Sequence, residues 1–336
     1  MEEKIFYEIN DVKDSKYTPL ELDYLLIVLS EGEERSRSAL IELLEKGICI
    51  SNLIVAKIPS SGVKLEEIIE SELLKKVKNI RYLFCEGLSD EELFASIRNE
   101  MCTNLKDKQI GLDISCMAIP LFFLLLKWFA KSEIKLFVYY TEPQRYIMNG
   151  GLFKSYFSTE GPVTIKEIMG YPGISVNGDN FDRILFCILG FDNDLLPHVI
   201  QEAVPSKIVA INGFPSFYPK FKDISLANNE KVLSGSEAEK LESGSDLTKY
   251  VYVEADNPFD AYNTLQRLSE RFNEYCIDIV PLGSKPMALG VCLFAVENSN
   301  VRVLYPFPEK YASATGRKSK KTLEYVLEFN DLEEFL

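Results

Sequence analysis

The amino-acid sequence predicts an α/β protein of two Rossmann-like halves, each with a parallel sheet, related by internal duplication and joined by a β-hairpin connector. Three observations carry this prediction. Short apolar runs alternate with longer helical segments, the runs are continuously apolar, and several segments recur in the same order in both halves. Continuously apolar strands are covered on both faces, as in a parallel sheet flanked by helices. The 336 residues suffice for about two domains.

The first half spans residues 1–146 and the second spans residues 183–336. In the first half, strands are predicted at residues 24–29, 53–58, 81–86, 110–115 and 134–141. Helices are predicted between them, at residues 33–45, 65–77, 90–101 and 119–130. The second half repeats the strands at residues 184–189, 207–211, 250–254, 277–280 and 301–305. Its predicted helices are residues 195–203, 259–275 and 286–296.

Matching segments indicate that the halves are copies of one unit. The sequence YTEPQRY at 140–146 resembles YPFPEKY at 305–311. Both begin and end with tyrosine, and both have a proline at the fourth position and a basic residue at the sixth. Upstream, YLFCE at 82–86 resembles YVYVE at 250–254, and Pro120 and Pro286 both open apolar helices. The order of the matches is the same in both halves, which favours duplication over chance.

Residues 147–182 are predicted to connect the halves through a β-hairpin, because they contain several Gly and Asn-Gly turn signals around short β-type runs. The last apolar run, residues 323–329, is predicted to add an edge strand to the second half. Arg35 is expected to be a surface charge on the first helix.

The composition of the chain argues against several classes of function. A net charge of −14 makes the chain a poor general binder of nucleic acid or anionic membrane. The seven cysteines are scattered without C-x-x-C spacing, as expected of reduced thiols in the cytoplasm. The first residues are charged and do not resemble a signal peptide, and the longest apolar stretch is too short for a bilayer. We therefore expect a cytoplasmic protein without membrane association. The sequence does not give the oligomeric state, and a homodimer stays open.

Ligands of open parallel sheets bind beyond the carboxyl ends of the strands. This rule selects polar residues directly after predicted strands as ligand-binding candidates: Asp113, Ser115, Glu142, Asp256 and Asn257. Two related halves packed face to face would join these edges into one cleft.

The most specific segment is the turn Gly283-Ser284-Lys285 before a predicted helix. Glycine lets the backbone approach a ligand closely, the helix N-terminus attracts anions, and Lys285 adds positive charge. These features predict a contact with phosphate or a nucleotide. The alternative is an ordinary helix cap with a solvent-facing lysine. The spacing is not that of a P-loop.

The sequence DIS at 113–115, followed by Pro120 opening an apolar helix, resembles the strand-to-helix segment of CRISPR-associated Rossmann-fold sensor domains. The turn at 283–285 resembles the turn that contacts the ligand before the last helix of that family. Cys-Met at 116–117 stands where the family often has His-Gly. The resemblance implies a regulatory sensor in antiviral defence that binds a nucleotide-type ligand, typically a cyclic oligonucleotide. No fused effector domain is recognisable, so a separate effector protein is implied.

Two other functions stay open. In the first, the chain is an enzyme of the phosphodiesterase type, in which Ser115, Ser284 and Lys285 polarise a phosphate and Asp113 or Glu86 acts as the base. The sequence offers no recognisable nucleophile–base pair, so we rank this second. In the other, the chain is an interaction subunit without a small ligand.

No cofactor and no metal site are expected. His198 is the only histidine, and the cysteines lack the spacing of zinc ligands.

Overall fold

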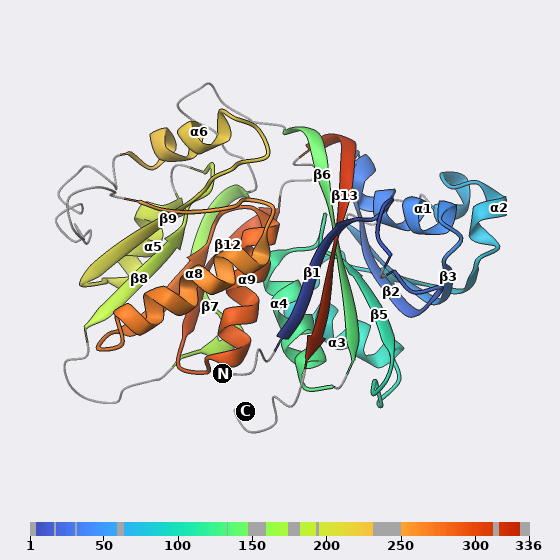
Figure 1. The fold of residues 1–336 in the computed structure, drawn as a ribbon, viewed down its shortest axis with the longest axis horizontal. Helices are drawn as coiled ribbons and strands as arrows, with labels where there is room; N and C mark the ends of the chain where they lie inside the picture. The colour runs from blue at the N-terminus through green and yellow to red at the C-terminus, as the bar shows by residue number, and fades with distance from the viewer. Residues whose placement is uncertain are drawn as a thin grey trace. The chain divides into compact units, whose positions relative to one another are not determined.

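The computed structural model describes residues 5–16, 18–30, 32–58, 64–132, 134–146, 159–173, 182–192, 195–230, 250–311 and 316–329. The chain divides into two compact units. The first contains Met1–Ile147 and Ser313–Glu334, and the second contains Met148–Ala312. Each unit is built around its own sheet (Figure 1).

The first unit has a seven-stranded sheet in the order β1-β13-β6-β5-β2-β3-β4. Its strands are β1 (Ile5–Asp11), β2 (Glu21–Ser30), β3 (Cys49–Ile58), β4 (Val77–Phe84), β5 (Gln109–Asp113), β6 (Lys135–Tyr146) and β13 (Gly316–Phe329). Strands β2 to β6 run parallel. The connecting helices are η1 (Glu34–Arg37), α1 (Ser38–Glu45), η2 (Leu65–Glu67), α2 (Ser71–Leu74), α3 (Asp90–Glu100) and α4 (Ile119–Ala130).

The second unit has a six-stranded sheet in the order β10-β9-β8-β11-β12-β7. Its strands are β7 (Thr159–Pro172), β8 (Arg183–Ile188), β9 (Lys207–Gly213), β10 (Val251–Val253), β11 (Cys276–Pro281) and β12 (Arg302–Tyr311). Strands β8 to β12 run parallel. The helices are α5 (Leu195–Ala203), α6 (Phe221–Asn228), α8 (Pro258–Arg271) and α9 (Lys285–Glu297).

The parallel strands of both sheets have the same order. Numbered along the chain within each unit, they lie as 3-2-1-4-5, namely β4-β3-β2-β5-β6 and β10-β9-β8-β11-β12. This is the Rossmann order, so the predicted fold class is confirmed. The matched segments take equivalent places: β4 and β10 are both third strands, and Pro120 and Pro286 both lie in the first turn of the helix before the fifth strand. Identical topology is what a duplicated unit predicts.

The sixth strand of each sheet does not follow that sheet's fifth strand in the chain. Strand β7 follows β6 in the chain but pairs antiparallel with β12, and β13 follows β12 but pairs antiparallel with β6. In Figure 1, β13 lies between β6 and β1. The repeated tyrosine segments form these ladders, with Tyr140 opposite Leu323 and Tyr305 opposite Lys166. The two copies therefore exchange equivalent strands.

This exchange departs from the sequence prediction at the connector and at the C-terminus. Residues 159–172 form one long strand that pairs with β12, rather than a hairpin within 147–182. Connector residues 147–158 and 174–181 lie outside the described ranges. The C-terminal run is a strand, as predicted, but it belongs to the first unit and is not an edge, because β1 pairs along its other side. The predicted second half, residues 183–336, thus differs from the second compact unit, which contains Met148–Ala312.

The predicted helix at 65–77 is also wrong. Its apolar spacing is helical, but Glu70 adopts an extended backbone (φ −56°, ψ 132°) and divides the segment into η2 and the short α2. Strand β4 then begins at Val77, earlier than predicted.

Two helices are buried around most of their circumference. Every residue from Pro286 to Val296 in α9 is buried, and α4 exposes only parts of Lys127 and Trp128. Helices that are apolar all round belong to a protein interior or to a membrane. No helix in the described ranges is long and apolar enough to span a bilayer.

The exchange predicts that β13 stabilises the first unit. Tyr325 of β13 is fully buried. We expect Tyr325→Ala to cost about 3–5 kcal/mol, because a large side chain is removed from a packed core. In hydrogen–deuterium exchange, the amides of β5 and β6 should then exchange faster while those of β11 and β12 stay unchanged. Lys321→Ala, at a partly exposed position of the same strand, is the control. Faster exchange in β11 and β12 alone would contradict the pairing.

Candidate functional site

Each sheet has one point where the strand order reverses, between its first and fourth parallel strands. In open α/β sheets the ligand crevice lies outside the carboxyl ends of the strands at this point. The point lies between β2 and β5 in the first unit and between β8 and β11 in the second. Asp113 ends β5 and Ser115 follows it, whereas Gly283, Ser284 and Lys285 follow β11. These five predicted residues therefore lie at the switch points, whereas Glu142 lies in β6 and Asp256 and Asn257 follow β10.

In the first unit, a buried ion pair lies at the switch point. The Nε and Nη2 atoms of Arg35 each lie 2.7 Å from Oε1 of Glu33. Both residues are about 95 % buried, being 4 % and 5 % exposed. The thiol of Cys116, from the loop after β5, donates to the other carboxylate oxygen of Glu33 at 3.4 Å. The expectation that Arg35 is a surface charge is wrong, because its guanidinium turns inward onto Glu33.

The surroundings of Arg35 keep it protonated. Burial alone would lower the pKa of Arg35, but the nearby Cys116 and Glu33 raise the pKa above its usual range. Tyr140 and Tyr146 also face this group, and their hydroxyls lie 3.2 Å apart. Burial raises the pKa of both phenols. The site is thus a compact set of charged and phenolic groups at the end of the first sheet.

Asp113, Ser115 and Glu142 lie at this same edge and bond to groups of their own unit. The Ser115 N–H donates to Asp113 Oδ1 at 2.8 Å, and Ser115 Oγ accepts from the N–H of Thr141 at 2.7 Å. These bonds join the end of β5 to β6. Glu142 is fully buried, and its Oε2 lies 3.3 Å from Nζ of Lys320 on the exchanged strand. The first switch point is therefore built largely from internal contacts.

In the second unit, the loops after β8 and β11 touch through glycines. A Cβ at Gly190 would lie 2.0 Å from the carbonyl oxygen of Leu282, and a Cβ at Gly283 would lie 2.7 Å from Ile188 Cγ2. The Leu282 N–H also donates to the Ile188 carbonyl at 3.0 Å. Side chains would force these loops apart, so glycine is required for their close approach.

Ser284 caps α9 and holds the neighbouring loop. Its Oγ accepts from the Met287 N–H at 3.3 Å and donates to the carbonyl of Ala255 at 2.5 Å. The Ala255 N–H donates in turn to the Pro215 carbonyl at 2.9 Å. The loops after β9, β10 and β11 are therefore tied together at the carboxyl edge of the second sheet.

Asn257 is the N-cap of α8. Its Oδ1 accepts from the N–H groups of Phe259 and Asp260 at 3.0 and 3.2 Å. Asp256, beside it, is partly buried. The capping interpretation thus accounts for Asn257 and for the hydroxyl of Ser284, and Lys285 is the first residue of α9.

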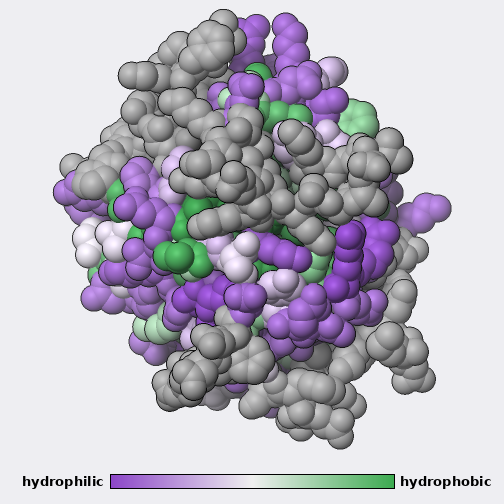
Figure 2. All heavy atoms as spheres, turned by 90° about the vertical axis from the view of Figure 1, so that its left-hand side faces the viewer, coloured by the Kyte–Doolittle hydropathy of each residue, from purple (hydrophilic) through white to green (hydrophobic). Residues whose placement is uncertain are grey.

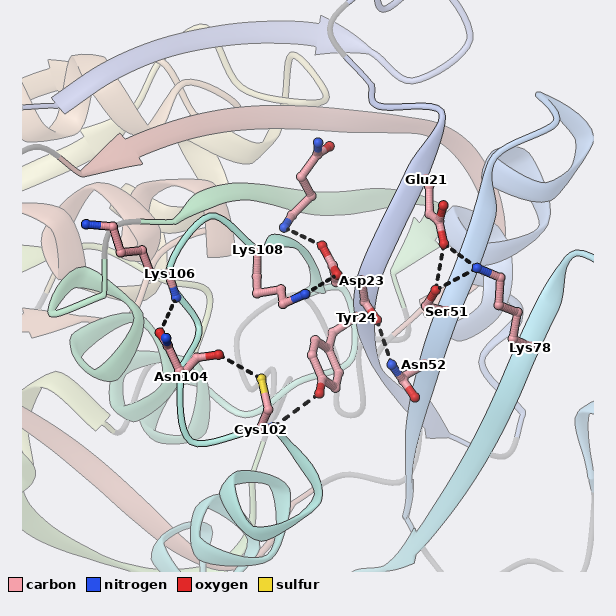
Figure 3. Close-up of polar contacts among 11 residues, drawn as sticks. Glu21, Asp23, Tyr24, Ser51, Asn52, Lys78, Cys102, Asn104, Lys106 and Lys108 are labelled. Carbon is pink, nitrogen blue, oxygen red and sulfur yellow. Dashed lines mark hydrogen bonds and ion pairs between the residues drawn. The ribbon is translucent and has the colours of Figure 1, made fainter.

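Sequence reasoning missed two groups of ionic contacts at the opposite, amino ends of the strands. In Figure 3, Glu21 contacts Lys78 and Asp23 contacts Lys108, linking neighbouring segments at the surface. In the second unit, Asp278 is fully buried in β11, and Arg302 binds both of its carboxylate oxygens. The apolar sequence around Asp278 does not indicate which residue will pair with its carboxylate. The described residues contain no cluster of three or more metal-ligating side chains.

The Glu33–Arg35 pair should show strong coupling. Arg35→Met alone should cost about 3–5 kcal/mol of unfolding free energy in urea, because Glu33 stays buried without the guanidinium. Adding Glu33→Gln should recover most of this loss. Arg37→Met, at a partly exposed position of the same 3-10 helix, is the control. Equal costs for Arg35→Met and Arg37→Met would refute the buried pair.

No family model and no curated protein matches the chain. Solved structures resemble it only distantly. A protein of unknown function from Pseudomonas aeruginosa is 10 % identical with a TM-score of 0.24, covering 86 % of this chain and 93 % of that one. A universal stress protein from Archaeoglobus fulgidus is 14 % identical with a TM-score of 0.24, covering 86 % and 97 %. The cytoplasmic domain of a prokaryotic cation chloride cotransporter is 8 % identical with a TM-score of 0.27, covering 87 % and 98 %. Scores this low assign no function, so the interpretation rests on the chain's own topology.

Proposed function

We propose that the chain is a regulatory sensor that binds a nucleotide-type ligand at the carboxyl edge of its second sheet. The observation that carries this proposal is the turn Gly283-Ser284-Lys285 at the switch point between β8 and β11. The glycines let the loops after β8 and β11 pack closely at this point. The N-terminus of α9 provides positive partial charge, and Lys285 adds a full charge, which together suit a phosphate group.

The position of Lys285 supports an anionic ligand. Lys285 is the first residue of α9, where a cation opposes the helix dipole at a cost of about 0.3–1 kcal/mol. A bound phosphate would offset the repulsion.

The hydroxyl groups favour a sensor over a hydrolase. Ser115 is fully buried and accepts from the backbone N–H of Thr141. Ser284 gives its proton to the carbonyl of Ala255 and caps α9. A nucleophilic hydroxyl needs access to substrate and a base to take its proton, and these contacts provide neither. The resemblance to CRISPR-associated sensors supports a role in antiviral defence with a separate effector.

The contacts at the carboxyl edge of the first sheet favour a second candidate function. Arg35 and Glu33 neutralise each other there, and Glu142 faces Lys320. An edge of this kind suits an interaction subunit without a small ligand. Co-purification of one stable partner, with no nucleotide released on denaturation, would support this alternative.

Calorimetric titration tests the sensor proposal. The probes are ATP, GTP, cyclic di-adenylate, cyclic di-guanylate and cyclic tetra-adenylate. We expect at least one to bind, and Lys285→Ala to weaken that binding about tenfold or more, because a charge-assisted bond to phosphate contributes about 1.5–3 kcal/mol.

Lys75→Ala is the matched control, because Lys75 is an exposed lysine of the first unit paired with Glu72. It should leave nucleotide affinity unchanged. The proposal fails if no probe binds the unmodified protein, or if Lys285→Ala binds as tightly as Lys75→Ala.

A further inference from the structure

Two aromatic side chains are exposed side by side at the carboxyl edge of the second sheet. Phe214 directly follows β9 and is 51 % exposed, and Tyr252 in β10 is 38 % exposed. Their ring centroids lie 6.0 Å apart in an edge-to-face arrangement, with an interplanar angle of 71°. Single exposed apolar residues are common on protein surfaces, but an ordered pair of rings at a binding edge calls for an explanation.

Backbone bonds hold this pair in place. The Phe214 N–H donates to the Val253 carbonyl at 2.6 Å. Lys222 of α6 places its Nζ 5.0 Å from the centroid of the Phe214 ring, within the range of a cation–π contact. Asn212 is buried in β9 and donates to the Lys222 carbonyl at 3.1 Å, which fixes α6 to the sheet. The rings and the ammonium group therefore form a preorganised surface.

The aromatic pair is structurally linked to the proposed phosphate turn. The residue after Phe214, Pro215, accepts from the N–H of Ala255, and the carbonyl of Ala255 accepts from Ser284. A Cβ at Gly213 would lie 3.1 Å from the Ala255 Cβ and 3.3 Å from the Met287 Sδ. One residue, Ala255, thus bridges the loop that carries the ring and the turn that would hold phosphate.

We infer that Phe214, Tyr252 and Lys222 form the base-binding platform of the nucleotide ligand. The inference rests on the proposed function and specifies its ligand as one that carries a nucleobase. Every base has a π-face, so stacking on Phe214 would give affinity with little dependence on base identity. Tyr252 would flank the stacked base, and Lys222 would add positive charge beside it.

A base fits this surface better than a protein partner. A stable protein interface buries about 800 Å² on each side, which is far more than two rings can contribute. Among the coloured residues of Figure 2, hydrophobic residues lie as separate small areas between hydrophilic ones.

The test compares aromatic and aliphatic replacements of the ring. Calorimetry with the tightest-binding nucleotide of the panel is carried out on Phe214→Tyr and Phe214→Leu. We expect Phe214→Tyr to keep the affinity within about twofold and Phe214→Leu to lose about fivefold or more, because only the first keeps a stacking surface. Phe84→Leu is the control, since Phe84 is a 61 % exposed ring on the first unit. It should not change the affinity.

The possible outcomes distinguish failure of the base-binding platform from failure of the sensor proposal. If a nucleotide binds and Lys285→Ala weakens it, but Phe214→Leu binds as well as Phe214→Tyr, the platform is refuted while the sensor proposal stands. If Phe214→Leu keeps nucleotide affinity but loses a co-purifying protein, the rings are a protein contact and the inference is overturned. If no nucleotide binds the unmodified protein, both proposals fail.

Discussion

Antiparallel pairing of the exchanged strands is the constraint on which both sheets depend. The fifth parallel strand of a sheet presents unpaired N–H and C=O groups along its outer side, and such an edge must be paired or protected. Strand β13 pairs this side of β6, and β7 pairs this side of β12. Strand β13 also pairs with β1, and its residues Leu323 to Leu327 are buried. The first sheet is therefore completed by residues 316–329 from the end of the chain, and the second by residues 159–172, which precede its parallel strands.

The sequence could predict the elements but not this pairing. Continuous apolar runs were enough for the parallel strands, and Pro120, Pro286 and the two tyrosine segments were enough for the duplication. The apolar pattern at 323–329 indicates a strand without naming its neighbour. In a duplicated protein β6 and β12 are equivalent strands with similar outer edges. The local sequence pattern of a following strand therefore cannot show whether it pairs with β6 or with β12.

For the candidate site too, the sequence could predict which residues lie there but not what their side chains contact. Asp113, Ser115 and the turn at 283–285 do lie at the switch points, because the carboxyl ends of parallel strands share one edge. What the side chains do there depends on tertiary contacts that no local pattern contains. Arg35 turns inward onto Glu33, Ser284 bonds the carbonyl of Ala255, and Phe214 stays exposed. The two copies have diverged: the first edge is neutralised internally, whereas the second retains a glycine-bordered turn with a lysine.

The central claim is that the switch point of the second sheet binds the nucleotide. Hydrogen–deuterium exchange of the unmodified protein, with and without a saturating nucleotide, tests this claim most directly. The account predicts slower exchange in peptides covering residues 213–217 and 282–288, with no change in peptides covering residues 113–117. Protection confined to the latter peptides, with the second unit unaffected in the nucleotide-bound protein, would contradict it.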